Sequence, residues 1–179
     1  MQKNILVGCA LLGMSVLVSA PAVAYNKAGT VTLTTSAGYD FFASRRNLQD
    51  TFVLPTVALA YNIDPTWALE GSYGTVLDTK RSNSAGGGHT RGGLYLVDGL
   101  YRFEQHAMLQ PYVSAGVGLL YLNPNGTDAT NQMNVNAGVG AQAFFAESVA
   151  LRGEVKDLYT MAGGKNDLLV DFGVSFLMG

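Results

Sequence analysis

Cysteine, charged residues and long apolar runs are all scarce in this sequence of 179 residues. Its one cysteine, Cys9, lies in the apolar N-terminal stretch, so the rest of the chain can form no disulfide. Charged residues make up 13% of the chain, about half of the share usual in soluble domains, and the net charge of −2 gives no reason to expect a nucleic-acid partner. No apolar run of about eighteen residues follows the N-terminal stretch, which excludes a helical membrane span.

The N-terminal stretch has the form of a secretory signal peptide. Lys3 supplies the positive charge, an apolar segment continues to Val18, and Ala22-Val23-Ala24 is a small-residue cleavage pattern. We therefore expect residues 1–24 to be removed and residues 25–179 to form one domain. Too little apolar sequence precedes the cysteine for cleavage of the lipoprotein type.

Apolar side chains alternate with small or polar ones at the end of the chain. From Asp167 to Gly179, the even positions Val170, Phe172 and Phe176 are apolar, whereas the odd positions are mixed. A period of two predicts an extended strand with one apolar face. Such a strand fits either the edge of a soluble sandwich or the closing strand of a transmembrane barrel, and the other strands decide between them.

Eight segments with this alternation occur in all, joined by connectors that are alternately long and short. The segments are residues 29–40, 51–62, 67–77, 94–103, 109–122, 133–144, 149–158 and 167–179. The long connectors are residues 42–50, 78–93, 123–132 and 159–166, and the short ones are 62–66, 104–108 and 145–148. An even number of strands with this alternation predicts an all-β fold, an eight-stranded antiparallel up-and-down transmembrane β-barrel.

The second segment contains a residue that fits a paired strand poorly. Pro55 cannot donate a hydrogen bond in a fully paired strand. If the alternation of side chains continues without a break through Pro55, Val53, Val57 and Leu59 lie on the outward face.

Aromatic residues gather at the ends of the segments, as they do at the two interfaces of a membrane. Those at the short connectors are Tyr61, Trp67, Tyr101, Phe103, Phe145 and Phe176, and those toward the long connectors are Tyr39, Tyr95, Tyr121 and Tyr159. Tyr73 fits less well, because it lies about 20 Å along the strand from Trp67, within the expected lipid band.

Charged residues fall on the inward faces of the segments. They are Glu70, Asp98, Arg102, Arg152, Glu154, Lys156 and Asp171. A soluble sandwich would keep this face dry and place its charges outside. Because side chains nearly fill the interior of an eight-stranded barrel, we expect these groups to pair or to hold water as an interior ionic network.

Two stretches carry a family resemblance. Residues 60–74 read A-Y-N-I-D-P-T-W-A-L-E-G-S-Y-G and residues 170–179 read V-D-F-G-V-S-F-L-M-G, and residues 110–118 and 137–154 extend the match. The chain resembles the N-terminal membrane domain of the outer-membrane protein A family. The resemblance implies an eight-stranded barrel in the bacterial outer membrane, an interior ionic network, roles in envelope integrity and surface adhesion, and at most a narrow ion pathway. The peptidoglycan-binding domain of longer members is not matched, so wall attachment is not assumed.

The same resemblance assigns roles to interior residues. Glu70 and Arg152 match the central acid and base of the family's lumen, and Glu154 matches a further interior acid. The family's alternative partners for the central pair are a Lys and a Glu, and those positions here hold Asp98 and Gln142. The pair could form a gate or a plug, and we expect a static plug.

Catalysis, metal binding and cofactor binding are not expected. A barrel enzyme needs a nucleophile or activated water beside a base, yet the only histidines are His89, in a Gly-rich connector, and His106, in a short turn. Two separate histidines also make no metal site. Arg45-Arg46 and Lys80-Arg81 lie in external connectors, either as solvated residues or as ligands for lipopolysaccharide phosphates.

The sequence therefore predicts a small outer-membrane barrel of a Gram-negative cell envelope, with a structural and surface-interaction role and a lumen plugged by the ionic network. The alternative function is a narrow porin-like channel for small ions or hydrophobic solutes. A lipid-modifying enzyme would need a Ser and His pair near one rim, which the sequence lacks. The expected partners are outer-membrane lipid, lipopolysaccharide, the barrel-assembly machinery during insertion, and a host or surface ligand at the external loops.

Overall fold

The computed structural model describes residues 26–44, 49–80, 89–103, 108–124 and 130–179, with the side chains at 54–55, 78–80, 89–90, 124 and 130 excepted. The strands are β1 (Val31–Phe41), β2 (Thr51–Asn62), β3 (Trp67–Lys80), β4 (His89–Arg102), β5 (Leu109–Pro124), β6 (Thr130–Ala146), β7 (Val149–Thr160) and β8 (Lys165–Met178). The expected signal peptide, residues 1–24, lies outside the described residues.

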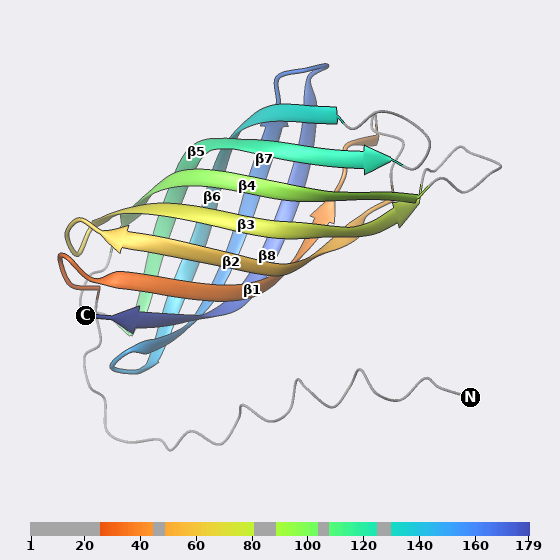
Figure 1. The fold of residues 1–179 in the computed structure, drawn as a ribbon. Coiled ribbons are helices and arrows are strands. Elements are labelled where there is room, and N and C mark those ends of the chain that lie inside the picture. The colour runs from red at the N-terminus through yellow and green to blue at the C-terminus, as the bar shows by residue number, and fades with distance from the viewer. Residues whose placement is uncertain (1–25, 45–48, 81–88, 104–107, 125–129) are drawn as a thin grey trace, which may run out of the picture.

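The strands form one closed barrel (Figure 1). Each strand pairs antiparallel with its neighbour in the sequence, and β8 returns to pair antiparallel with β1 from Val31↔Met178 to Phe41↔Leu168. The predicted eight-stranded antiparallel up-and-down barrel is therefore confirmed. Nowhere in the described part of the chain is a helix both long and apolar enough to cross a membrane.

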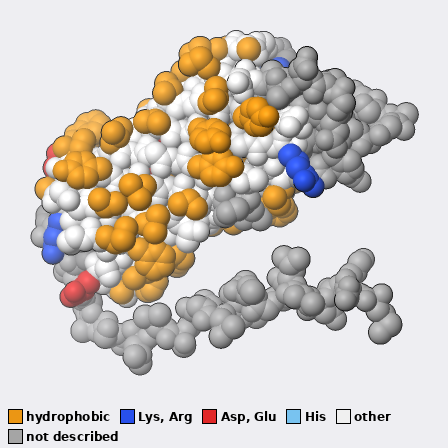
Figure 2. All heavy atoms as spheres, viewed as in Figure 1, with side chains coloured by type: hydrophobic (Ala, Val, Ile, Leu, Met, Phe, Trp, Pro, Cys, Tyr) orange, Lys and Arg blue, Asp and Glu red, His pale blue; other side chains and the backbone are white. Residues whose placement is uncertain are grey.

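Side chains alternate between the outside of the barrel and its interior. On β7, Leu151 and Val155 are 55% and 40% exposed, whereas Arg152 and Lys156 are each 4% exposed. Hydrophobic side chains cover much of the outer face in Figure 2, and the charged side chains visible there lie toward the two ends. An apolar surface of this extent is unusual for a monomer in water, and it suits a lipid environment.

The alternation is interrupted in β2, where one prediction was wrong. Val53 was expected outside, but it is fully buried in the interior. The register with β1 passes from Ser36↔Thr56 to Gly38↔Val53, so β2 has one more residue than β1 in this interval. This β-bulge includes Pro55, and the extra residue reverses the face on which the following side chains lie.

The connectors differ less in length than the sequence suggested. Strand β4 already begins at His89, which was expected in a flexible loop, and the expected long connector at 159–166 is reduced to residues 161–164. Gly163 and Gly164 have φ values of 84° and 56° there, a conformation that glycine adopts without steric cost. We call the end of the barrel with residues 42–50 and 161–164 the loop end, and the end with residues 63–66 the turn end.

Aromatic rings lie on the outer surface near both ends. At the turn end, Trp67 and Tyr101 have ring centroids 4.9 Å apart. At the loop end, Tyr39 and Phe52 have ring centroids 4.9 Å apart. Tyr73 pairs with Tyr95 of β4 about midway along β3, with centroids 4.8 Å apart, so it lies between the two end groups, as the sequence pattern indicated.

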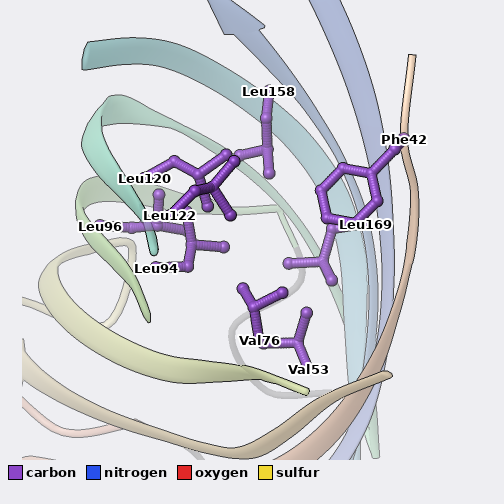
Figure 3. Packing of buried hydrophobic residues seen from close by; sticks show 9 residues of the cluster. All are labelled: Phe42, Val53, Val76, Leu94, Leu96, Leu120, Leu122, Leu158 and Leu169. Atoms are coloured by element: carbon purple, nitrogen blue, oxygen red, sulfur yellow. The ribbon is translucent and has the colours of Figure 1, made fainter. Parts of the chain in front are cut away.

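The interior consists of three layers along the barrel axis. The apolar layer fills the loop end (Figure 3) and is formed by Phe42, Val53, Val76, Leu94, Leu96, Leu120, Leu122, Leu158 and Leu169. The ionic layer lies in the middle of the strands and is formed by Glu70, Asp98, Arg152, Glu154, Lys156 and Asp171. The amide layer lies at the turn end and is formed by Asn26, Asn62, Gln110 and Gln142.

Candidate functional site in the lumen

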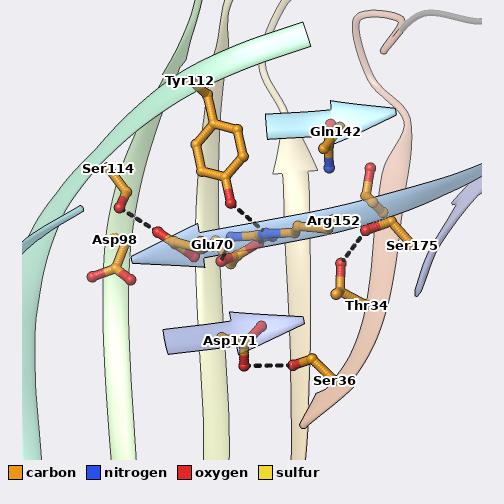
Figure 4. A network of polar contacts seen from close by, with 12 residues as sticks. Thr34, Ser36, Glu70, Asp98, Tyr112, Ser114, Gln142, Arg152, Asp171 and Ser175 are labelled. Atoms are coloured by element: carbon orange, nitrogen blue, oxygen red, sulfur yellow. Dashed lines mark hydrogen bonds and ion pairs between the residues drawn. The ribbon is translucent and has the colours of Figure 1, made fainter. Parts of the chain in front are cut away.

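The centre of the ionic layer is the pair of Glu70 and Arg152. Glu70 is on β3 and Arg152 on β7, four strands apart in a ring of eight, so the two side chains meet from opposite walls. Arg152 Nη2 donates to Glu70 Oε1 at 2.8 Å, and Nη1 donates to Oε2 (Figure 4). Both residues are almost fully buried. Two parallel charge-assisted hydrogen bonds fix the orientation of both groups.

Arg152 has further partners on neighbouring strands. Its Nε donates to the hydroxyl oxygen of Tyr112 at 2.7 Å, and Nη2 also donates to Glu154 Oε2 at 2.9 Å. The guanidinium carbon lies 5.0 Å from the centre of the Tyr112 ring. All three nitrogens of the guanidinium group are thus hydrogen-bonded within the lumen.

Lys156 is the second cation of the layer. Its Nζ forms an ion pair with Asp98 Oδ2 and lies 3.4 Å from Glu154 Oε1. Ser114 donates to the same Glu154 oxygen at 2.6 Å. Glu154 therefore links Arg152 and Lys156 into one network that reaches from β3 and β4 to β7.

Two of the predicted site residues stand apart from this network. The carboxylate of Asp171 accepts a hydrogen bond from Ser36 at 2.8 Å and forms no ion pair within the described residues. Arg102 lies in the amide layer, where its Nη2 donates to Asn62 Oδ1 at 2.8 Å. The structure thus brings together five of the seven predicted residues, and the functional role of the set stays a prediction.

Glycines on β5 and β6 provide the space that the ionic layer occupies. A Cβ atom added at Gly138 would lie 2.7 Å from Ser114 Oγ and 2.9 Å from Glu154 Oε1. A Cβ atom at Gly140 would collide with the hydroxyl of Tyr112. The A-G-V-G sequence at 137–140 therefore places valine outside and leaves room inside for long polar side chains.

The amide layer was not predicted from the sequence. Asn26 Nδ2 donates to Gln110 Oε1 at 2.9 Å and to Gln142 Oε1 at 3.2 Å. Asn62 Nδ2 donates to the hydroxyls of Thr30 and Thr32 at 2.9 and 3.0 Å. Asn62, Gln110 and Gln142 are buried at inward positions of their strands, whereas Asn26 precedes β1, so no strand alternation indicates where its side chain lies.

Two buried acids near the loop end were not included in the predicted ionic network, although the alternation places Asp40 on the inward face. Asp40 is fully buried and Asp167 is 1% exposed. Asp167 Oδ1 accepts a hydrogen bond from the backbone nitrogen of Ala43 at 2.9 Å, while Phe42 packs into the apolar layer. The start of the first long connector therefore folds over the lumen.

Some predicted surface features cannot be placed. Arg45-Arg46, Arg81 and His106 lie outside the described residues, and the side chains of Lys80 and His89 are not described. Within the described ranges, no group of three or more His, Cys, Asp or Glu residues could hold a metal ion.

The chain matches the family model of the OprF membrane domain over residues 2–179. The protein belongs to the OprF membrane domain family. This confirms the resemblance to an outer-membrane barrel domain that the sequence motifs indicated, and it places the chain in the bacterial outer membrane. Outer-membrane lipid and lipopolysaccharide are therefore the surroundings of the apolar outer face.

Solved structures agree on the fold. The N-terminal β-barrel domain of Pseudomonas aeruginosa OprF is 20% identical, with a TM-score of 0.64, and the match covers 86% of this chain and all of that one. Neisserial surface protein A is 14% identical, with a TM-score of 0.67 and coverage of 82% and 96%. Ail of Yersinia pestis, solved with the heparin analogue sucrose octasulfate, is 10% identical, with a TM-score of 0.60 and coverage of 84% and 99%. A comparison with curated proteins gave no significant match.

Proposed function

We propose that this protein is a structural and surface-interaction barrel of the outer membrane, serving envelope integrity and adhesion, with a lumen that a static plug closes to solutes. The observation that carries the proposal is the ion pair of Glu70 and Arg152, which joins opposite walls across the middle of the lumen. The alternative is a narrow porin-like channel for small ions or hydrophobic solutes.

The partners of the pair support a plug over a gate. A gate that works by exchange needs a second partner for each ion. Asp98, at one of the alternative positions, is bound to Lys156, and Gln142, at the other, accepts a hydrogen bond from Asn26. Arg152 is also held by Tyr112 and Glu154. Moving one group would leave several buried charges without partners, which is costly in a low-dielectric interior.

The layers on either side support the same conclusion. The apolar layer lies between the network and the loop end, and Asn26 lies across the turn end on Gln110 and Gln142. An ion entering from either end would first meet desolvating apolar side chains or occupied amides. A plug of three layers does not depend on any single ion pair.

Planar-bilayer recording tests this proposal. Residues 25–179 are refolded and inserted, insertion is verified by the gel shift of unheated samples, and current is recorded for the wild type and for Glu70→Ala. The plug predicts no discrete current steps for the wild type and no added current for the variant. Steps in the wild type that Glu70→Ala changes in size or frequency would support the channel instead.

The proposal assigns no catalytic role and no cofactor. The carboxylates of Glu70, Asp98 and Glu154 are bound to Arg152 and Lys156, which hinders proton exchange with a substrate.

A surface role rests on the external loops. One structurally similar protein binds a sulfated heparin analogue, and the pairs Arg45-Arg46 and Lys80-Arg81 offer the cations that such a ligand or lipopolysaccharide phosphate needs.

Adhesion to immobilised heparin or to host cells tests the surface role. Cells that express the wild type are compared with cells that express an Arg45→Ala and Arg46→Ala double variant at the same surface level. Reduced binding by the variant is the expected result. Equal binding would show that Arg45 and Arg46 have no part in the surface role. Envelope integrity is tested separately, by asking whether expression of the protein restores detergent resistance to a strain from which its gene has been deleted.

A further inference from the structure

A small cavity lies inside the barrel between the apolar and ionic layers. Its volume is about 30 Å³, and its lining includes Leu94, Leu96 and Leu169 together with Glu154 and Asp171. A water molecule needs about 10 to 15 Å³ of such space. The cavity therefore has room for a small ion and one water molecule.

The charges around this cavity do not balance. Glu70, Asp98, Glu154 and Asp171 supply four negative charges, and Arg152 and Lys156 supply two positive charges, which leaves a formal charge of −2. Arg102 supplies a third positive charge at the turn end, where it donates to the neutral Asn62, so these seven groups together keep an excess of one negative charge. Unbalanced charge in a lipid-surrounded interior is strongly unfavourable without a counter-ion or a proton.

Asp171 is the carboxylate at which the excess is located. It is 8% exposed, lines the cavity, and accepts a hydrogen bond from Ser36 through Oδ2. Its other oxygen accepts no side-chain hydrogen bond from any residue that the structure describes, and Figure 4 shows the Asp171 carboxylate beneath the pair of Glu70 and Arg152. One carboxylate oxygen thus remains available to a ligand.

Hydroxyl groups complete an oxygen-rich wall. Thr34, Ser36, Thr56 and Ser72 all line the cavity. Among the described residues, Thr56 Oγ1 has no hydrogen-bond partner. An uncommitted carboxylate beside neutral oxygen donors is the ligand set of a hard cation.

We propose that this cavity binds one monovalent cation, sodium or potassium, through the Asp171 carboxylate and the surrounding hydroxyl oxygens. A divalent ion fits less well, because calcium takes about six to eight oxygen ligands and usually several carboxylates, whereas Glu70, Asp98 and Glu154 are held by Arg152 and Lys156. The bound cation lowers the excess negative charge and stabilises the folded barrel.

Unfolding in different salts tests the site. Residues 25–179 are refolded in lipid vesicles and unfolded with urea in sodium, potassium or choline chloride at equal ionic strength, since choline is too large for the cavity. At a cation concentration of about a hundred times Kd, the folding equilibrium constant should be about a hundredfold higher than in choline. Asp171→Asn should remove this difference, and Asp157→Asn, at an exposed aspartate outside the lumen, should keep it.

Two outcomes overturn the proposal: equal stability of the wild type in all three salts, or the same salt preference in Asp171→Asn. If Asp171→Asn does not refold, Ser36→Ala is tested in its place. The comparison of the wild type in the three salts is decisive even without a variant. Crystals grown with thallium in place of potassium give an independent readout. An anomalous peak beside Asp171 is expected, and a peak only elsewhere contradicts the site. Bilayer currents do not enter this test, so it stands or fails separately from the plug.

Discussion

Arg152 of β7 and Glu70 of β3 join opposite walls of the barrel by two parallel hydrogen bonds. Both side chains are almost fully buried, with the apolar layer on one side of the pair and the amide layer on the other. The contribution of such a pair is best seen when one partner is removed, since the other is then a buried charge without compensation.

Glu70→Gln should lower the free energy of unfolding by about 3 to 5 kcal/mol, the usual cost of breaking a buried ion pair. Urea unfolding in lipid vesicles, followed by the gel shift of unheated samples, measures this loss. Glu147→Gln is the matched control, because Glu147 is exposed in the turn between β6 and β7. Equal stability of the two variants would show that the ion pair does not hold the barrel together.

Tyr112→Phe should remove the hydroxyl that accepts the hydrogen bond from Arg152 Nε. A buried donor without its partner costs about 1 to 3 kcal/mol. Tyr95→Phe is the comparison, since Tyr95 is on the outer surface and 51% exposed. If both tyrosine variants unfold at the same urea concentration, the hydroxyl of Tyr112 contributes nothing to the network.

Gly138→Ala should destabilise the barrel by about 1 to 3 kcal/mol, as overpacked interiors do. The added methyl group would press on Ser114 and Glu154, which lie 2.7 and 2.9 Å from its position. Gly71→Ala is the control, because a Cβ atom at Gly71 meets nothing within 4 Å. A Gly138 variant as stable as the Gly71 variant would mean that the interior is looser than described.

Val139→Lys should cost about 2 to 4 kcal/mol in vesicles, since it places a charge on the lipid-facing surface near the middle of the membrane. Val139 is 60% exposed and lies in the middle of β6. Asn123→Lys, at the exposed loop end of β5, should change stability little. Comparable losses at both positions would be inconsistent with a lipid-facing outer surface.

Much of this fold could be predicted from the alternation of apolar and polar side chains along each strand. On β3, β4, β7 and β8 the sequence pattern gave the correct face for the side chains, because one register holds from Trp67 to Val76 of β3 and all along the pairing of β7 with β8. It failed at Val53, where a bulge adds one residue near Pro55 and reverses the faces. Proline signalled an irregularity there, but no local pattern tells on which side of it the extra residue lies.

The contacts inside the lumen were harder to predict than the faces. The sequence indicated which charges point inward, but the pairing of Asp98 with Lys156, and the isolation of Asp171, depend on which walls meet across the barrel. The amide contacts of Asn26 are equally non-local, since they join residues far apart in the sequence. Such contacts are set by barrel closure and shear, which no single strand encodes.

A nitroxide scan along β8 tests the central claim most directly. Cys9 lies outside residues 25–179, so single cysteines at residues 168–178 can be labelled without background. In vesicles, collision with oxygen should alternate with a period of two, high at Phe172 and Phe176 and low at Asp171 and Ser175. Loss of this alternation, or high values at Asp171 and Ser175, would contradict a barrel with lipid outside and an ionic interior.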